Sequence, residues 1–232
     1  MIYFRGIALE NVAPVKIEDI RVSPINLSVT ARQRPVGYGA EFVRIGGGSR
    51  SVQITFALLV HDIAERMSFI QHITDWARSD TEGELVIPDK IGVYLSCICT
   101  ALPELSMRQW WESKLRLTFT TFDNPFWTST VERNIACGNA FNVVGSAPPL
   151  MRIYKSRNSS GSNQSYSDGT NTMTFSTVPA GEMVIDLNRQ TAAVGGTSIM
   201  QYYSFSSSFI PPVTGIQTIT GNGTVYWRER WQ

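Results

Sequence analysis

The sequence contains few of the residues that usually carry out chemistry in proteins. Its 232 residues include three cysteines and two histidines. Charged residues make up 17% of the chain, where about 25% is usual. Lys and Arg total 20 and Asp and Glu total 19, so the net charge of +1 excludes a strongly basic nucleic-acid-binding protein. No apolar run approaches the roughly 18 residues that a membrane-spanning helix needs.

The cysteines are Cys97, Cys99 and Cys137, an odd number. The N-terminal residues lack the basic, then apolar, then small-residue order of a secretory signal peptide. Disulfide frameworks belong mostly to secreted proteins, so we expect free and mostly buried thiols. We also expect the chain to be made and used in the cytosol unless something else exports it.

Catalytic and metal-binding patterns are absent from the sequence. His61 and His72 are too far apart to share a metal ion, because their spacing corresponds to about 16 Å along a helix. Gly46-Gly47-Gly48 is not followed by the Lys-Ser/Thr pair of a phosphate-binding loop. We therefore expect no cofactor, no metal ion and no catalytic residue.

The composition changes along the chain. Residues 1–135 contain 14 Lys or Arg and 15 Asp or Glu, whereas residues 136–232 contain 6 and 4. The change falls near Cys137, just after a cluster of proline and aromatic residues. Both parts have the size of ordinary domains, so we predict one domain over 1–135 and a second over 136–232.

The first domain is predicted to consist mostly of strands. Every second residue is apolar over 51–60, and residues 115–120 alternate in the same way, which is typical of half-buried strands. Residues 92–101, rich in β-branched and aromatic side chains, are a third strand candidate.

One helix is predicted between these strands, over residues 62–79. Asp62 and Glu65 have the spacing of a capping box, with Asp in place of the usual Ser or Thr. Mostly apolar residues recur at helical spacing and predict a stripe that packs on a sheet: Ile63, Met67, Ile70, Ile73, Thr74 and Ala77.

Residues 32–50 have a different character. They contain five glycines around Tyr38, Phe42, Val43 and Ile45. A Gly-rich, strand-like segment of this length predicts a projecting hairpin or loop rather than a core element. Its aromatic and apolar side chains would then need a partner that buries them.

The second domain is predicted to be all-β. Short strand candidates, separated by turns, occur at 151–154, 173–177, 182–187, 191–194, 215–220 and 224–231. This pattern is typical of a sandwich or a barrel. The polar, Ser- and Gly-rich residues 158–171 are predicted to form a mobile loop.

Aromatic residues gather near the C-terminus, where Tyr226, Trp227 and Trp231 lie in the last predicted strand. They could form a platform that stacks on sugar rings, or they could fill the core of the sandwich. Alternation places Trp227 and Trp231 on one face and Tyr226 on the other, together with Arg228 and Arg230. The face with both arginines is expected to be at least partly exposed.

Four stretches of the sequence, taken in order, resemble one protein family. They are Phe4-Arg5-Gly6 with Ile20-Arg21-Val22; residues 52–77 followed by Gly83-Glu84-Leu85-Val86-Ile87-Pro88-Asp89; Phe122-Asp123-Asn124-Pro125-Phe126-Trp127; and the second domain from Gly138-Asn139, with Val184-Ile185-Asp186-Leu187 and residues 225–231. Their order and spacing resemble those of the distal tail proteins (Dit) of bacteriophages with long, non-contractile tails. The resemblance covers essentially the whole chain.

The resemblance implies a mainly β architecture with one helix, an α+β class. The N-terminal domain would be a β-sandwich with a helix and a protruding hairpin, and the C-terminal domain a galectin-like β-sandwich. The chain would be no enzyme. Copies of it would form a ring, expected to be hexameric, that joins the tail tube to the baseplate or tip. The implied partners are other copies of the chain, the tail tube protein, the tape-measure protein, and tail-tip and receptor-binding proteins. The implied location is the virion, after synthesis in the host bacterium's cytoplasm.

The Gly-rich segment is the candidate oligomer interface, in which it would embrace a neighbouring subunit. Arg34, Tyr38, Phe42 and Arg44 are the candidate contact residues, with the two aromatic residues as anchors. Two other functions stay open. One is a sugar-binding module that uses the C-terminal aromatic residues, and the other is a cell-wall hydrolase, for which no catalytic set is visible.

Overall fold

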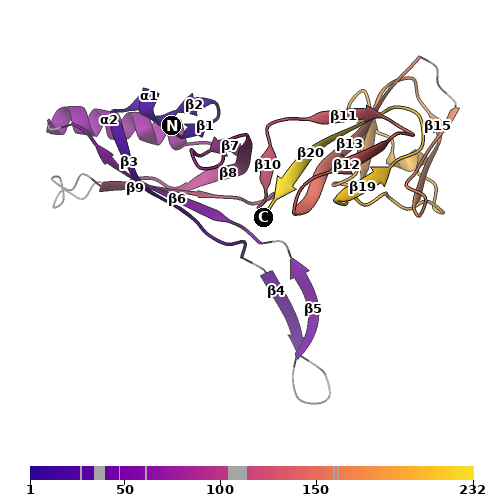
Figure 1. Cartoon of the computed structure of the whole chain (residues 1–232), viewed down its shortest axis with the longest axis horizontal. Coiled ribbons are helices and arrows are strands. Elements are labelled where there is room, and N and C mark those ends of the chain that lie inside the picture. Colours follow the sequence, from indigo (N-terminus) through magenta and orange to yellow (C-terminus); the bar gives the residue numbers. More distant parts are fainter. Residues whose placement is uncertain are drawn as a thin grey trace. The chain divides into compact units, whose positions relative to one another are not determined.

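The computed structural model divides the chain into two compact units, Met1–Trp127 (unit 1) and Thr128–Gln232 (unit 2). It describes residues 1–26, 28–33, 40–46, 48–60, 62–103, 114–158, 160 and 162–232, with 28–33, 40–46 and 162 described by their backbone alone. Figure 1 labels the elements. Unit 2 begins earlier than the change in composition, because β11 (Arg133–Ala136) still belongs to the charged part of the sequence but pairs with β20 (Thr224–Trp231).

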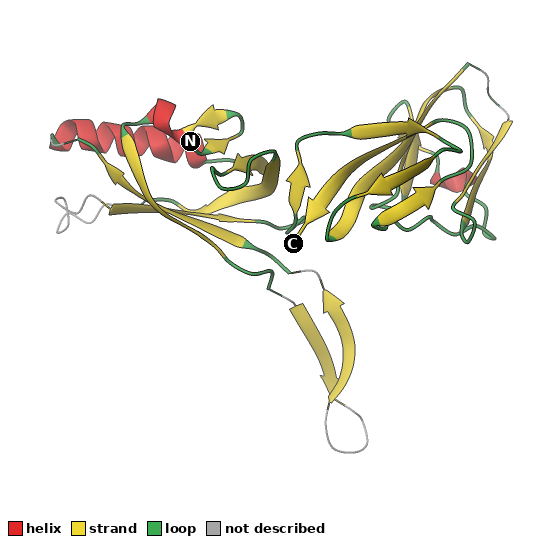
Figure 2. Ribbon diagram, viewed as in Figure 1, coloured by secondary structure: helices red, strands yellow, loops and turns green. Residues whose placement is uncertain are grey.

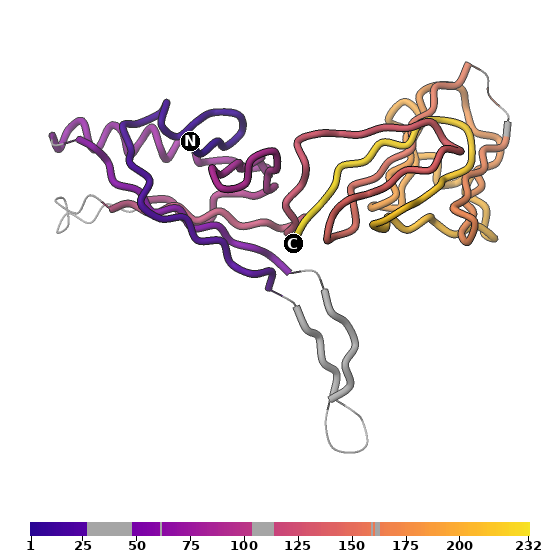
Figure 3. Tube along the Cα trace, in the orientation of Figure 1, coloured from indigo at the N-terminus to yellow at the C-terminus, as the bar shows by residue number. Residues whose placement is uncertain are grey.

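Unit 1 is built on antiparallel strands in the order β2-β1-β7-β8-β9-β6-β3. These strands are β1 (Tyr3–Phe4), β2 (Ile7–Ala8), β3 (Val15–Val22), β6 (Ser51–Leu58), β7 (Gly83–Val86), β8 (Val93–Ala101) and β9 (Lys114–Thr120). The three strands predicted in this unit are confirmed as β6, β8 and β9. Figure 3 shows β3 and β6 running side by side, although a long stretch of chain separates them.

The helical part of unit 1 consists of a short α1 (Leu9–Val12), which the sequence did not predict, and of α2 (Ile63–Ala77). Figure 2 shows α2 lying along one face of the sheet. The side chain of Asp62 accepts hydrogen bonds from the amides of Ala64 (2.8 Å) and Glu65 (3.0 Å). The predicted helix and its N-cap residue are therefore confirmed.

The predicted apolar stripe of α2 is wrong at its N-terminal end. The buried residues are Arg66, Ile70, Ile73, Trp76 and Ala77. By contrast, the side chains of Ile63 and Met67 are each 55% exposed. The Trp76 ring meets Phe4 edge-on at 5.8 Å, and its Nε1 donates to the Ile7 carbonyl at 3.1 Å. These contacts orient the helix, and periodicity alone does not reveal them.

The Gly-rich segment contains β4 (Ser28–Gln33) and β5 (Ala40–Gly46). They form an antiparallel hairpin with a register irregularity between Thr30 and Ala31. Within the described residues, this hairpin is a two-stranded sheet of its own, and no third strand pairs with it. The predicted hairpin is confirmed, and its first strand begins at Ser28, before the Gly-rich segment itself.

Unit 2 is a two-layer β-structure. One layer has the strand order β11-β20-β13-β16-β17-β18, and the pairs β12–β19 and β14–β15 lie outside it. Both sets of strands contribute to one hydrophobic core, in which Phe141, Tyr166 and Phe175 pack with Ile153, Ile185 and Trp227. The predicted sandwich is therefore confirmed. The remaining elements are β10 (Trp127–Ser129), β12 (Ala140–Val143), β13 (Ala147–Arg157), β14 (Ser162–Ser167), β15 (Thr172–Val178), β16 (Gly181–Asp186), β17 (Thr191–Val194), β18 (Thr197–Ser198), η2 (Met200–Tyr202) and β19 (Gly215–Thr218).

The loop predicted over 158–171 is wrong, because strand β14 occupies part of it and pairs with β15. Tyr166 is 1% exposed, and its hydroxyl donates to the Asn222 carbonyl at 3.0 Å. Tyr166 thus packs this otherwise polar strand against the core, and Gln164 of the same strand is buried as well. The turn that follows is closed by the Asp168 carboxylate, which accepts from the Thr170 and Asn171 amides.

The N-cap of α2 can be tested directly. We expect Asp62→Ala to lower the free energy of unfolding of unit 1 by about 1 kcal/mol, because two amide groups lose their acceptor. Asp62→Asn keeps a side-chain oxygen and is expected to cost much less. Urea unfolding followed by circular dichroism measures both variants. Equal losses in the two variants would contradict the capping role.

Candidate functional site

The root of the hairpin continues the ladder between β3 and β6. The ladder ends at the pair Val22↔Val52, and beyond it the Ser23 amide donates to the Ser51 carbonyl at 2.8 Å. The Asn26 amide then donates to the Ser49 carbonyl at 3.0 Å. The hairpin is therefore attached by both of its strands to the end of a two-stranded ladder.

Gly48 allows the two chains at this root to approach closely. A Cβ atom on Gly48 would collide with the carbonyl oxygen of Asn26. Any larger residue would force the two chains apart, so glycine is required here by close approach of backbone atoms.

Arg50 lies at the same root and is 6% exposed. Its amide donates to Thr121 Oγ1 at 2.9 Å, and its carbonyl accepts from the Thr121 amide at 2.9 Å. These bonds tie the root to the residue after β9. The guanidinium atoms Nε and Nη1 are buried and have no hydrogen-bond partner among the described residues, and burial lowers the pKa of Arg50.

The hairpin carries the residues predicted to contact a neighbouring subunit. Register places Phe42 opposite Ala31 and Arg44 opposite Thr30, both on β5. Arg34 and Tyr38 lie outside the described residues. The structure thus brings two of the four candidate residues onto one strand of the hairpin.

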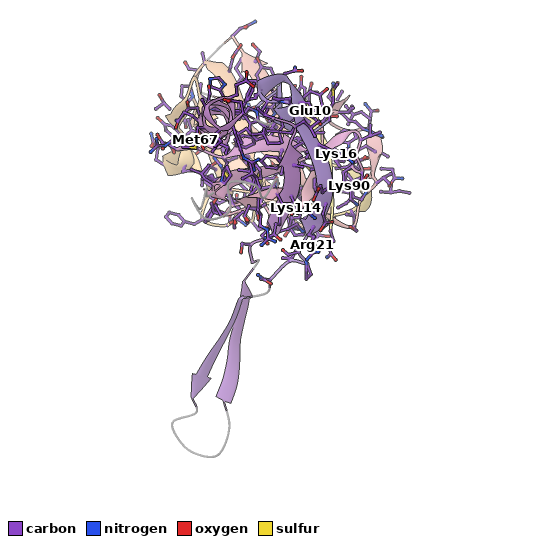
Figure 4. All side chains as sticks on the ribbon, turned by 90° about the vertical axis from the view of Figure 1, so that its left-hand side faces the viewer. Glu10, Lys16, Arg21, Met67, Lys90 and Lys114 are labelled. Carbon is purple, nitrogen blue, oxygen red and sulfur yellow. The ribbon has the colours of Figure 1, made fainter. Side chains whose placement is uncertain are left out.

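A second surface of unit 1 lies at the N-terminal end of α2, and we call it the α2 groove. Its volume is about 690 Å³, and it is lined by Pro14, Leu59, Val60, Asp62, Glu65, Ser68, Phe69 and His72. Leu59 is 61% exposed and Phe69 is half-buried. The exposed side chains of Ile63 and Met67 are not among those that line the groove. Met67 points outward from α2 in Figure 4, apart from Lys16 and Arg21 of β3. Sequence reasoning missed this surface because its lining residues come from separate segments of the chain, which only the fold brings together.

The C-terminal aromatic residues of unit 2 do not share one surface. Trp227 is 5% exposed and its ring lies 4.7 Å from that of Phe141, so it belongs to the core. Trp231 is half-buried. Tyr226 is half-buried on the opposite face of β20. That face is partly exposed at Tyr226 and Arg228, as expected. Arg230 on the same face is buried and donates from Nε to the Pro148 carbonyl.

Tyr226 lies in a small polar and aromatic surface on β13, β16 and β20. A hollow of about 290 Å³ is lined by Arg152, Tyr154, Val184 and Tyr226. The Arg152 guanidinium lies 5.4 Å from the centre of the Tyr226 ring, and the two tyrosine rings meet edge-on at 6.3 Å. A hydrogen bond to the Glu182 carboxylate raises the pKa of Tyr154.

The described residues show no group of three His, Cys, Asp or Glu side chains that could hold a metal ion. In the same part of the chain, no helix is long and apolar enough to cross a membrane. The three cysteines are free thiols, as predicted. Burial raises the pKa of Cys97 and raises that of Cys99 to about 11, so neither thiol ionises readily near neutral pH.

No family model matches the chain, and no curated protein matches it either. Among solved structures, it is similar to the Dit (gp 19.1) protein of phage SPP1, described as a paradigm of the hub adsorption apparatus in phages that infect Gram-positive bacteria. The identity is 13% and the TM-score 0.74, and the match covers 100% of this chain and 98% of that chain. A chain of the activated, Ca-bound baseplate of phage P2 is similar with 10% identity and a TM-score of 0.48, over 94% of this chain and 90% of that chain. The chain therefore has the fold of the SPP1 protein along its whole length, which confirms the mainly β class.

The position of Trp227 leads to a stability prediction. We expect Trp227→Ala to destabilise unit 2 by about 3–5 kcal/mol, because it leaves a cavity beside Phe141. Trp231→Ala removes a half-buried ring and is expected to cost far less. Chemical denaturation of the two variants gives both values. Similar losses would show that Trp227 does not hold the core together.

Proposed function

We propose that this chain is a structural subunit of a bacteriophage tail and that six copies form a closed ring. The ring would join the tail tube to the baseplate or tip. Its partners would be other copies of the chain, the tail tube protein, the tape-measure protein, and tail-tip and receptor-binding proteins. The chain would be a virion component made in the cytoplasm of the host bacterium, and it would catalyse no reaction.

The observation that carries this proposal is the full-length likeness in fold to the SPP1 Dit protein, with a TM-score of 0.74. That protein is described as a paradigm of the hub adsorption apparatus. Unit 1, unit 2 and the connecting chain all fall within the match, so the likeness is not limited to a common β-sandwich.

The hairpin supports self-assembly as the mode of action. A two-stranded hairpin is at best marginally stable in water by itself. In the described chain, β4 and β5 pair with each other and with no other strand. Contact with a neighbouring subunit would stabilise them, and a ring gives every hairpin such a neighbour.

A second candidate function is sugar binding, and it rests on the hollow beside Tyr226. The tyrosine rings and the Arg152 guanidinium offer apolar faces and hydrogen-bond donors to a saccharide. Tyr226→Ala would then abolish binding to cell-wall polysaccharide without unfolding the chain. Trp231→Ala would leave that binding unchanged.

Removing the hairpin tests the ring. We expect a variant in which a short Asn-Gly turn replaces residues 27–47 to remain folded but monomeric. The bond of 3.0 Å between the Asn26 amide and the Ser49 carbonyl holds the two ends close enough for such a turn. Native mass spectrometry and electron microscopy of negatively stained particles measure the assembly. The intact chain is expected to show a six-fold annulus, and a six-fold annulus in the shortened variant would contradict the proposed role of the hairpin.

A further inference from the structure

We propose that the hollow beside Tyr226 binds one uncharged pyranose unit of a saccharide. This inference rests on the second candidate function, sugar binding, and adds to it the class of sugar and the groups that hold it. Three features of unit 2 carry it: the short side chains that form the floor of the hollow, the aromatic rings of its walls, and charged side chains that are already paired with one another.

The floor of the hollow follows from the register of the strands. Tyr154 of β13 lies opposite Val184 of β16, and Val184 lies opposite Ala193 of β17. On its other side, Tyr154 lies opposite Thr224 of β20. Because their neighbours along each strand are buried in the core, these side chains face away from it. Short side chains next to a tyrosine leave a depression in this face, and Val184 lines it.

The hollow has the size of one sugar ring. Its volume is about 290 Å³. Because one water takes up about 30 Å³ of liquid, a space of this volume holds roughly ten non-hydrogen atoms, which is close to one pyranose ring with its hydroxyl groups. The remaining units of a longer saccharide therefore lie outside the hollow.

The walls offer aromatic faces to the apolar side of a pyranose. The Tyr154 and Tyr226 rings stand at 90° to each other with their centres 6.3 Å apart, so their faces point in different directions. The Arg152 guanidinium lies 5.4 Å from the centre of the Tyr226 ring and packs against it. The face of an aromatic ring carries partial negative charge, which attracts the C–H groups on one side of a sugar ring.

The charged side chains around the hollow are paired with one another. Arg152 Nη2 donates to Glu132 Oε2 at 2.9 Å, and Arg228 Nε lies 3.7 Å from the other oxygen of the same carboxylate. The Tyr154 hydroxyl donates to the Glu182 carboxylate. A guanidinium has several N–H donors and a carboxylate has several lone pairs, so paired groups still offer donors and acceptors to sugar hydroxyls. The pairing holds these groups in place before a ligand arrives.

The balance of charge on this face favours an uncharged ligand. Arg152 and Arg228 share the Glu132 carboxylate, and Arg152 also lies opposite Asp186 in the register of β13 and β16. Glu182 adds a further carboxylate. A phosphate or carboxylate of a ligand would have to displace Glu132 from an arginine, and it would meet the other two acids. A hydroxyl group needs no such exchange.

A panel of sugars tests the class of ligand. Biolayer interferometry measures binding of the full chain to immobilised conjugates of glucose, galactose, N-acetylglucosamine and rhamnose as neutral probes. Glucuronic acid conjugates and glycerol-phosphate teichoic acid are the anionic probes. We expect the chain to bind one or more of the neutral sugars, and to bind every anionic probe about tenfold more weakly or less. Binding to the neutral sugar is expected to change little with salt, because salt screens interactions between charges.

Variants with matched controls locate the site. Tyr226→Ala and Arg152→Gln are each expected to weaken binding to the neutral sugar by about tenfold or more, because they remove an aromatic face and a set of donors. Phe205→Ala removes a fully exposed ring elsewhere in unit 2, and Arg189→Gln removes an exposed arginine that does not line the hollow. Both controls are expected to bind the sugar as the intact chain does.

A filled hollow gives a test that removes no binding group. Val184→Phe places a ring on the floor of the hollow and is expected to block the sugar while Arg152, Tyr154 and Tyr226 remain. The melting temperature of each variant, followed by circular dichroism, shows whether unit 2 is still folded. Val184→Phe decides the question if Tyr226→Ala unfolds the chain.

The outcomes are distinct. Binding to a neutral sugar that the folded hollow variants lose and the two controls keep supports the inference. Neutral binding that survives in Tyr226→Ala or in Val184→Phe would overturn it. Binding to the anionic probes alone, lost in the same variants, would also overturn it but would leave sugar binding at the hollow as a function. No binding to any probe would overturn both, whereas the proposed ring is decided separately by the mass of the assembly.

Discussion

Seven backbone pairs join β3 to β6, from Val15↔Leu58 to Val22↔Val52. The inward-facing residues of β6, among them Ile54 and Phe56, are fully buried in the core of unit 1. The same ladder holds the α2 groove at one end and the hairpin root at the other. A slip of one residue in its register would turn the core face outward and displace both surfaces at once.

Two features of the hairpin and its root lack stabilising contacts among the described residues. The β4–β5 hairpin has only itself to pair with among the described residues, and a hairpin of this kind gains little stability alone. At its root, two nitrogens of the buried Arg50 guanidinium have no acceptor among the described residues, and an unpaired buried donor costs free energy in a folded protein. In the proposed ring, a neighbouring copy would stabilise this part of the backbone.

The sequence predicted the elements that are specified by residues close together in the chain. The alternation that begins at residue 51 predicted β6, Asp62 predicted the start of α2, and the glycines predicted the hairpin. Features set by contacts distant in sequence were not predictable. Met67 is exposed because Trp76 and its neighbours orient the helix. Strand β14 pairs with β15, and its Tyr166 reaches the carbonyl of Asn222, far along the chain. The composition of the Gly-rich segment predicted the hairpin. The α2 groove could be found only from the fold, because its lining residues Pro14, Leu59 and Glu65 come from three different segments.

The central claim is that a neighbouring copy stabilises the hairpin. The most direct test of this claim is hydrogen exchange of the backbone amides in 28–33 and 40–46. The exchange is measured on the same chain below and above the concentration at which it assembles. We expect exchange in these strands to slow by about tenfold or more on assembly, while the amides of β6 change little. Equal exchange of the β4 and β5 amides in the free and assembled chain would contradict the claim.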